Sequence, residues 1–172
     1  MDYIKKALEL RIIKSPEEAI GYQARMLSAE TAGRLECIAA LTTINASLVI
    51  KQAPLTEPRY DMWTTSGDTV VAIETKDRNI SSDRYQKIGV SQKKWDMLLN
   101  IEKAPNRMIL FCETFTDGKA MFWDVNNTPY TIKQWVHSRY EEKPGNTITE
   151  GMIELDPKDA KYVVRYDRIR RG

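Results

Sequence analysis

The sequence is poor in the residues on which several common catalytic sites depend. Its 172 residues include one histidine, His137, and two cysteines, Cys37 and Cys112. A lone histidine argues against Ser-His-Asp or Cys-His catalysis and against histidine-rich zinc sites. The two cysteines lie far apart and form no metal-spaced cluster. The 8 glycines build no phosphate-cradling loop, so we expect no nucleotide cofactor.

Long hydrophobic runs are also missing. No apolar stretch approaches the roughly 20 residues that a helix needs to cross a bilayer, and the N-terminus is too charged for a signal peptide. Two isolated thiols suit a reducing compartment. We therefore expect a cytoplasmic protein with no membrane partner. The length and a hydrophobic content of 42% predict one domain over residues 1–172, with an N-terminal helical extension over about 1–28.

The sequence does contain an acid on one predicted strand and a Glu-x-Lys at the end of the next. Glu74 and Lys76 share a face because strand residues i and i+2 point the same way. The turn Ser66-Gly67-Asp68 folds the two strands into a hairpin, which brings Asp61 beside Glu74. Two carboxylates at close range repel each other and favour a hard cation such as Mg²⁺. A neighbouring lysine can orient or deprotonate a water that attacks phosphorus, which is nuclease chemistry.

Asp61, Glu74 and Lys76 resemble the signature of the PD-(D/E)xK nuclease superfamily, which includes restriction enzymes and archaeal-type Holliday junction resolvases. Tyr60 stands where the signature has proline. The resemblance covers roughly residues 29 to 125 and implies a restriction-endonuclease-like α/β fold, a mixed β-sheet flanked by helices. It also implies that Asp61, Glu74 and the Thr75 backbone carbonyl bind Mg²⁺, for which Mn²⁺ substitutes. Lys76 would act on the attacking water and on the developing charge.

The same resemblance suggests two further catalytic positions. Resolvase-like members carry an acid on the first core helix that helps to hold the metal or its water ligands. Glu36 is our assignment for this acid, and Glu30 is the alternative. Other members place a glutamine on the helix after Glu-x-Lys, against the scissile phosphate. Gln92 matches that position by order, with Gln86 as a competitor.

Basic residues gather in two stretches, one after the Glu-x-Lys and one at the C-terminus, while residues 139–159 are acidic. Phosphate backbones attract such basic stretches, although solvated charged faces are the alternative interpretation. The residues that we expect to contact DNA are Arg78, Arg84, Lys87, Lys93, Lys94, Arg168, Arg170 and Arg171.

Periodicity and turn residues predict alternating helices and strands. The nearly continuous apolar run over residues 70–73 is typical of a central strand, which places the hairpin near the middle of the sheet. The predicted helices cover residues 2–13, 15 to about 41 with or without a break near Gly33, 92–99 and 131–140. The predicted strands cover about 47–52, 60–65, 69–77, 107–115, 119–125 and 151–155.

Together these patterns predict a metal-dependent DNA nuclease, in our assignment an endonuclease. Cutting two strands needs two sites, so a symmetric homodimer is expected, with a nicking monomer as the alternative. Two alternatives stay open. One is a catalytically inert nucleic-acid-binding module on the same fold. The other is an interaction protein in which Asp61 and Glu74 pair with Arg59 or Lys76.

Overall fold

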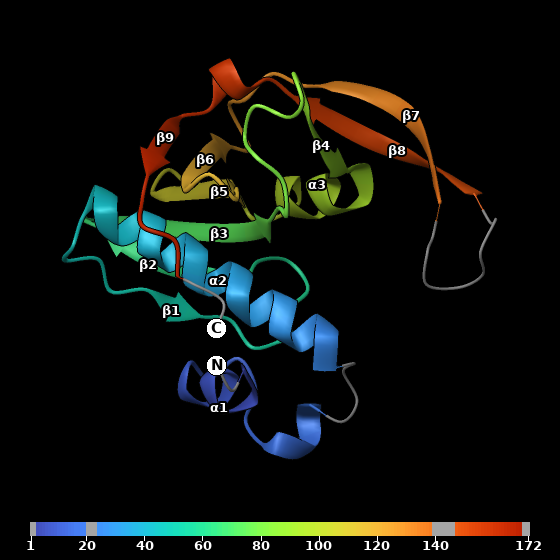
Figure 1. Ribbon diagram of the computed structural model, residues 1–172. Helices are drawn as coiled ribbons and strands as arrows, with labels where there is room; N and C mark the ends of the chain where they lie inside the picture. The colour runs from blue at the N-terminus through green and yellow to red at the C-terminus, as the bar shows by residue number, and fades with distance from the viewer. Residues whose placement is uncertain (1–2, 20–23, 139–146, 170–172) are drawn as a thin grey trace.

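A six-stranded mixed sheet forms the centre of the molecule (Figure 1). The structure is a computed structural model that describes residues 3–19, 24–138 and 147–169. The strand order is β1-β2-β3-β5-β6-β9. These strands are β1 (Lys51–Gln52), β2 (Met62–Ser66), β3 (Thr69–Asp77), β5 (Arg107–Thr114), β6 (Lys119–Asp124) and β9 (Tyr162–Arg165).

The long strand β3 lies inside this sheet, between β2 and β5. It pairs antiparallel with β2 and parallel with β5, and the remaining neighbours are antiparallel. Gly67 turns the β2–β3 hairpin at φ 58°, a left-handed conformation that glycine adopts without strain. The mixed sheet with helices on its faces confirms the predicted fold class and the interior position of the hairpin.

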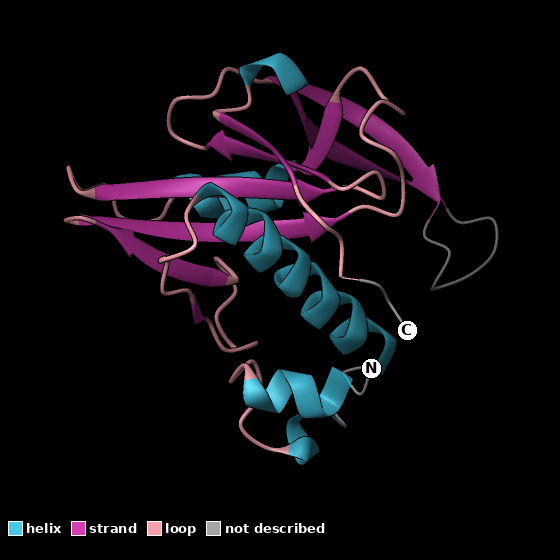
Figure 2. Cartoon of the chain, turned by 60° about the vertical axis from the view of Figure 1, so that its left-hand side comes forward, coloured by secondary structure: helices cyan, strands magenta, loops and turns pink. Residues whose placement is uncertain are grey.

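Helix α2 (Ala24–Ile44) covers one face of the sheet (Figure 2). Its apolar residues pack against alternate residues of β3, β5 and β6. This core layer includes Cys37, Leu41, Ile73, Leu110 and Phe122. Because α2 lies over β3, it carries its polar residues to the strand that ends in Glu-x-Lys. Helix α2 is the longest helix, and no described helix is both long and apolar enough to cross a membrane.

Helix α3 (Gln92–Leu99) and a second sheet cover the opposite face. That sheet has three strands in the order β4-β8-β7, namely β4 (Ile88–Ser91), β8 (Thr147–Leu155) and β7 (Thr131–Ser138). Trp95 of α3 is fully buried and meets Phe111 edge-on, with ring centroids 6.2 Å apart. Trp123 and Ile153 complete this core. The β7–β8 pair extends beyond the main sheet as an arm (Figure 1).

The N-terminal segment forms its own small layer below α2. Helix α1 (Tyr3–Glu9) and the 3-10 turn η1 (Pro16–Ala19) enclose a cluster that contains Ile12, Ile13 and Leu27. A second 3-10 turn, η2 (Pro157–Asp159), precedes β9. Leu27 of α2 belongs to the same cluster, so this helix takes part in both layers. The predicted boundary of the N-terminal extension at about residue 28 stays a prediction.

The predicted helix over 131–140 is wrong, because residues 131–138 form strand β7. Each residue of β7 has a partner on β8, for example Ile132 with Ile153 and Val136 with Thr149. Successive side chains of β7 therefore alternate between the two faces of the sheet. Strands β4 and β9 were not predicted. The predicted strand over 47–52 is reduced to the two residues of β1, and residues 16–19 of the predicted helix from 15 to about 41 form the 3-10 turn η1.

Candidate active site

Asp61 and Glu74 are neighbours at the open end of the β2–β3 hairpin. The register pairs Met62 with Ile73, and the Asp61 N–H donates to the Ile73 carbonyl at 2.9 Å. One step further along, Asp61 therefore lies opposite Glu74. Each residue is only 8% exposed. The fold thus places two carboxylates side by side in a largely water-excluded setting.

The Asp61 side chain is held by two donors. Its Oδ2 accepts the Thr75 backbone N–H at 2.7 Å, and its Oδ1 accepts Nη2 of Arg34 at 3.2 Å. In a strand the N–H and C=O of one residue point to the same side. The Thr75 carbonyl is therefore directed to the side of β3 on which Asp61 lies.

Arg34 of α2 is the organising cation of this end of the hairpin. It is 1% exposed, and its Nη1 donates to the carbonyl oxygens of Ala53 at 2.5 Å and of Asp61 at 2.6 Å. Its Nε donates to Oε1 of Glu30 at 2.8 Å, one helical turn earlier. Arg34 thereby fixes the backbone of Asp61 and brings a third acid, Glu30, to the site.

Lys94 of α3 approaches the same acids from the other face of the sheet. Its Nζ lies 2.8 Å from Oε1 of Glu74 and donates to the Pro58 carbonyl at 3.1 Å. The second oxygen of Glu74, Oε2, is buried and has no hydrogen-bond partner among the described residues. A buried, unsatisfied carboxylate oxygen is costly, so it marks a place where a cation or a donor is missing.

The electrostatics of the three acids are coupled. Burial raises the pKa of Asp61 well above its usual value, and the charges of Glu74 and Glu30 raise it further against the opposing Arg34. Burial also raises the pKa of Glu74, with partial compensation from Lys94. Burial opposes ionisation of Glu30 too, but its contacts with Asp61 and Arg34 outweigh this and lower its pKa. A bound cation would relieve this mutual repulsion.

These residues fit a divalent cation of the magnesium type. No group of three or more His, Cys, Asp or Glu side chains is arranged for a metal ion in the described part of the chain. Mg²⁺ does not need such a cage, because it usually binds through one or two carboxylates and completes its shell with water and substrate phosphate. Asp61, Glu74 and the Thr75 carbonyl form such a set, and the unpartnered Glu74 oxygen is its free position.

Glu36 lies in a different cluster from Asp61. Its Oε1 accepts Nε and Nη2 of Arg168 at 3.3 Å, and Nη2 of Arg168 also lies 3.2 Å from Oδ1 of Asp77. Arg168 thus fastens the C-terminal segment to α2 and β3. Of the two helix acids, Glu30 is the one that the structure brings to Asp61, and its i,i+4 spacing to Arg34 is the sequence signal for it.

Lys76 is exposed on β3 and shares its face with Glu74. Its register partner on β5 is Glu113, which is fully buried. Burial raises the pKa of Glu113, while Arg78 and Lys76 counteract the rise. Arg78 donates to Oε1 of Glu113 at 2.9 Å and to the Gly89 carbonyl at 2.6 Å, so it is tied into the fold.

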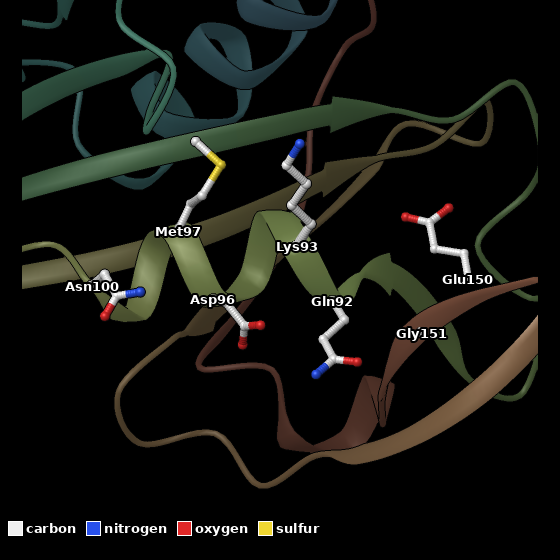
Figure 3. A pocket seen from close by; sticks show the side chains of 7 residues that line it. All are labelled: Gln92, Lys93, Asp96, Met97, Asn100, Glu150 and Gly151. Carbon is white, nitrogen blue, oxygen red and sulfur yellow. The ribbon is translucent and has the colours of Figure 1, made fainter.

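Gln92, the first residue of α3, faces the second sheet. A Cβ on Gly151 of β8 would collide with the Gln92 side-chain amide, so the glycine permits this packing. Gln92 lines a pocket of about 480 Å³ together with Lys93, Asp96 and Glu150 (Figure 3). Neither Asp61 nor Glu74 lines that pocket, and the competing Gln86 is exposed.

The other predicted DNA contacts differ in availability. Arg84 and Lys93 are exposed, whereas Lys87 forms an ion pair with Asp156 at 2.6 Å. Arg170 and Arg171 lie outside the described residues.

No protein-family model and no curated protein sequence matches the chain. Among solved structures, the chain is similar to Archaeoglobus fulgidus Hjc, a Holliday junction resolvase from an archaeal hyperthermophile. The two share 14% sequence identity and a TM-score of 0.49, over 78% of this chain and 90% of that one.

Proposed function

We propose that the protein hydrolyses DNA phosphodiester bonds with a divalent cation, Mg²⁺ or Mn²⁺, held by Asp61, Glu74 and the Thr75 carbonyl. The observation that carries the proposal is the buried carboxylate pair in which Oε2 of Glu74 lacks a hydrogen-bond partner in the part of the chain that the structure describes. When bound, the cation would neutralise charge on the scissile phosphate and lower the pKa of a water molecule.

The protein groups around the pair have separate roles in this proposal. Arg34 and the Thr75 N–H fix the orientation of the Asp61 carboxylate. Lys94 offsets part of the Glu74 charge through Oε1, and no described group donates to Oε2. Lys76, exposed on the face that carries Glu74, orients the water whose oxygen attacks phosphorus and stabilises the negative charge that develops there. The attacking water gives up a proton to solvent, the bond from phosphorus to the leaving oxygen breaks, and that oxygen takes up a proton from solvent.

The described part of the chain also presents exposed cations, which suit a polyanionic substrate. Lys76, Arg84 and Lys93 are exposed and are available to phosphates. Glu30 joins the site through Arg34 and Asp61, so it replaces Glu36 as the proposed helix acid. A homodimer that offers one such site to each DNA strand and a cytoplasmic location stay predictions.

A panel of branched, linear and circular DNAs, incubated with Mg²⁺, Mn²⁺ or EDTA, tests the proposal. Wild-type protein should cleave at least one of these DNAs only when the metal is present. Asp61→Asn should abolish cleavage and keep the fold, because one anionic ligand becomes neutral without a change of shape. Asp68→Asn is the matched control, since this exposed acid lies at the turn of the same hairpin, between β2 and β3. Cleavage by Asp61→Asn at the wild-type rate would refute the assignment.

A catalytically inert DNA-binding module is the second candidate function. Arg34 and Lys94 already neutralise Asp61 and Glu74 in part, which a purely structural acid pair would also require. In that case DNA binding would persist in EDTA, and no DNA would be cut with either metal.

A further inference from the structure

A cavity adjoins the acid pair on the same face of the hairpin. Trp63 lies two residues after Asp61, and Ala72 lies two residues before Glu74. Trp63 and Ala72 are register partners in the β2–β3 hairpin. The side chains of Trp63, Ala72 and Glu74 therefore project to one face of the sheet. Tyr60, which directly precedes Asp61 in the chain, also lines the cavity. The cavity measures about 460 Å³, within the range of small-ligand sites. It is lined by Arg59, Tyr60, Trp63, Val70, Ala72, Ile101, Glu102 and Arg107.

Two aromatic rings form part of its wall. Trp63 and Tyr60 are partly exposed, whereas Trp95 and Trp123 are fully buried and packed into the core. The Trp63 ring also has the Nζ of Lys51 4.6 Å from its centroid. An exposed indole beside a concave space is a surface on which a planar ring can stack.

Basic side chains frame these rings. The Arg59 guanidinium lies 5.9 Å from the Tyr60 ring centroid, and the Arg59 side chain is 51% exposed. Arg59 pairs with Glu57, and Arg107 donates to the Glu102 carbonyl at 2.8 Å. Arg107 also lies 3.6 Å from the exposed carboxylate of Glu102. The three cations, including Lys51, outnumber the two acids that contact them.

We infer that this cavity binds an unpaired nucleobase of the DNA strand, next to the phosphate that is cleaved. The base stacks on Trp63, while Arg59, Arg107 and Lys51 contact the flanking phosphates. The inference rests on the proposed function, because it is the acid pair that places the scissile phosphate beside the cavity. Aromatic stacking on bases within a basic groove is the usual way to hold single strands without sequence preference. A base inside a duplex is already stacked, so the preferred substrate has an unpaired segment at the cleavage point.

The test is fluorescence anisotropy of the full chain with three labelled probes in EDTA: single-stranded oligothymidylate, a blunt duplex and thymidine monophosphate. Trp63→Leu should weaken single-strand binding by about 5- to 150-fold, the loss expected for one stacked base, and leave duplex binding unchanged. Trp63→Phe, which keeps a ring, should retain most of the single-strand affinity. Trp135→Leu on the β7 arm is the control and should change neither affinity.

Equal losses for single strand and duplex with Trp63→Leu would overturn the inference, as would wild-type affinity in that variant. Binding of the mononucleotide as tightly as the oligonucleotide would identify a free-nucleotide pocket and overturn it too. Equal unfolding midpoints of Trp63→Leu and Trp63→Phe exclude a loss of fold as the cause. The proposed function fails separately: it is refuted when wild-type protein cuts no DNA with Mg²⁺ or Mn²⁺, even if the Trp63 variants behave as expected.

Discussion

Replacing Arg34 by methionine should destabilise the protein more than any change at a surface arginine. The guanidinium is 1% exposed and donates to two carbonyl oxygens and to two carboxylates. Methionine fills much of the volume of the arginine stem, so the packing loss is small. The main loss is the partner of Asp61, because removing one member of a buried ion pair costs about 3–5 kcal/mol.

The partial exposure of Glu30 places the expected loss of stability near the lower end of this range of about 3–5 kcal/mol. Its side chain is 32% exposed, so water can replace part of what Arg34 supplied. Asp61 and the Ala53 carbonyl lack that access, since both residues are buried. We therefore expect a decrease of about 3 kcal/mol in the free energy of unfolding.

Urea unfolding monitored by tryptophan fluorescence measures this free energy. Arg59→Met is the matched control, because Arg59 forms its ion pair with Glu57 at 51% exposure. Surface pairs contribute about 0–1 kcal/mol, so this variant should stay close to wild type. Equal stability losses in the two variants would refute the view that Arg34 is the internal support of Asp61.

Three further predictions concern the charges of the site. Lys94→Ala should strengthen Mn²⁺ binding several-fold, because it removes a competing cation from Glu74, and weaker binding in calorimetry would contradict this. Lys76→Ala should keep Mn²⁺ and DNA affinity but lower kcat by about 10²-fold or more, and equal falls in affinity and turnover would instead make Lys76 a phosphate anchor. The raised pKa of Asp61 means that the folded state holds its proton more tightly than the unfolded chain. The stability of wild type relative to Asp61→Asn should therefore decrease as the pH rises above about 4, and a rising difference would contradict the sign.

The hairpin could be predicted from the sequence because its determinants are local. Alternating residues, the glycine turn at Gly67 and the apolar run of β3 set the register, and the register alone places Asp61 opposite Glu74. Long apolar strands β5 and β6 were predictable for the same reason.

The partners of the acids could not be predicted, because they come from elements that dock only in the tertiary structure. Lys94 reaches Glu74 from helix α3, which follows β3 in the chain only after β4. In the sequence, Lys94 resembled a surface lysine. Arg34 occupies a buried position where a charge is unexpected until the carbonyls that it satisfies are known. Arg168 joins Glu36 across the whole chain, so no local pattern could separate Glu36 from Glu30.

The strand at 131–138 was mistaken for a helix because both faces of β7 are polar and exposed in part. A helix interpretation relied on apolar spacing around Trp135, but this ring packs over Gly89 of β4, on the far side of β8 in the same sheet. Pairing with β8 decides the conformation of β7. The sequence pattern did not predict that these two segments pair.

Calorimetric titration of Mn²⁺ into the wild-type protein and into Glu74→Gln tests the central claim most directly. Oε2 of Glu74 is the unpartnered buried oxygen on which the metal assignment depends. We predict one binding event per chain in the wild type and in the surface control Asp68→Asn, and its loss in Glu74→Gln. Identical titration curves for wild type and Glu74→Gln, or no Mn²⁺ binding by the wild type, would contradict the proposed metal site.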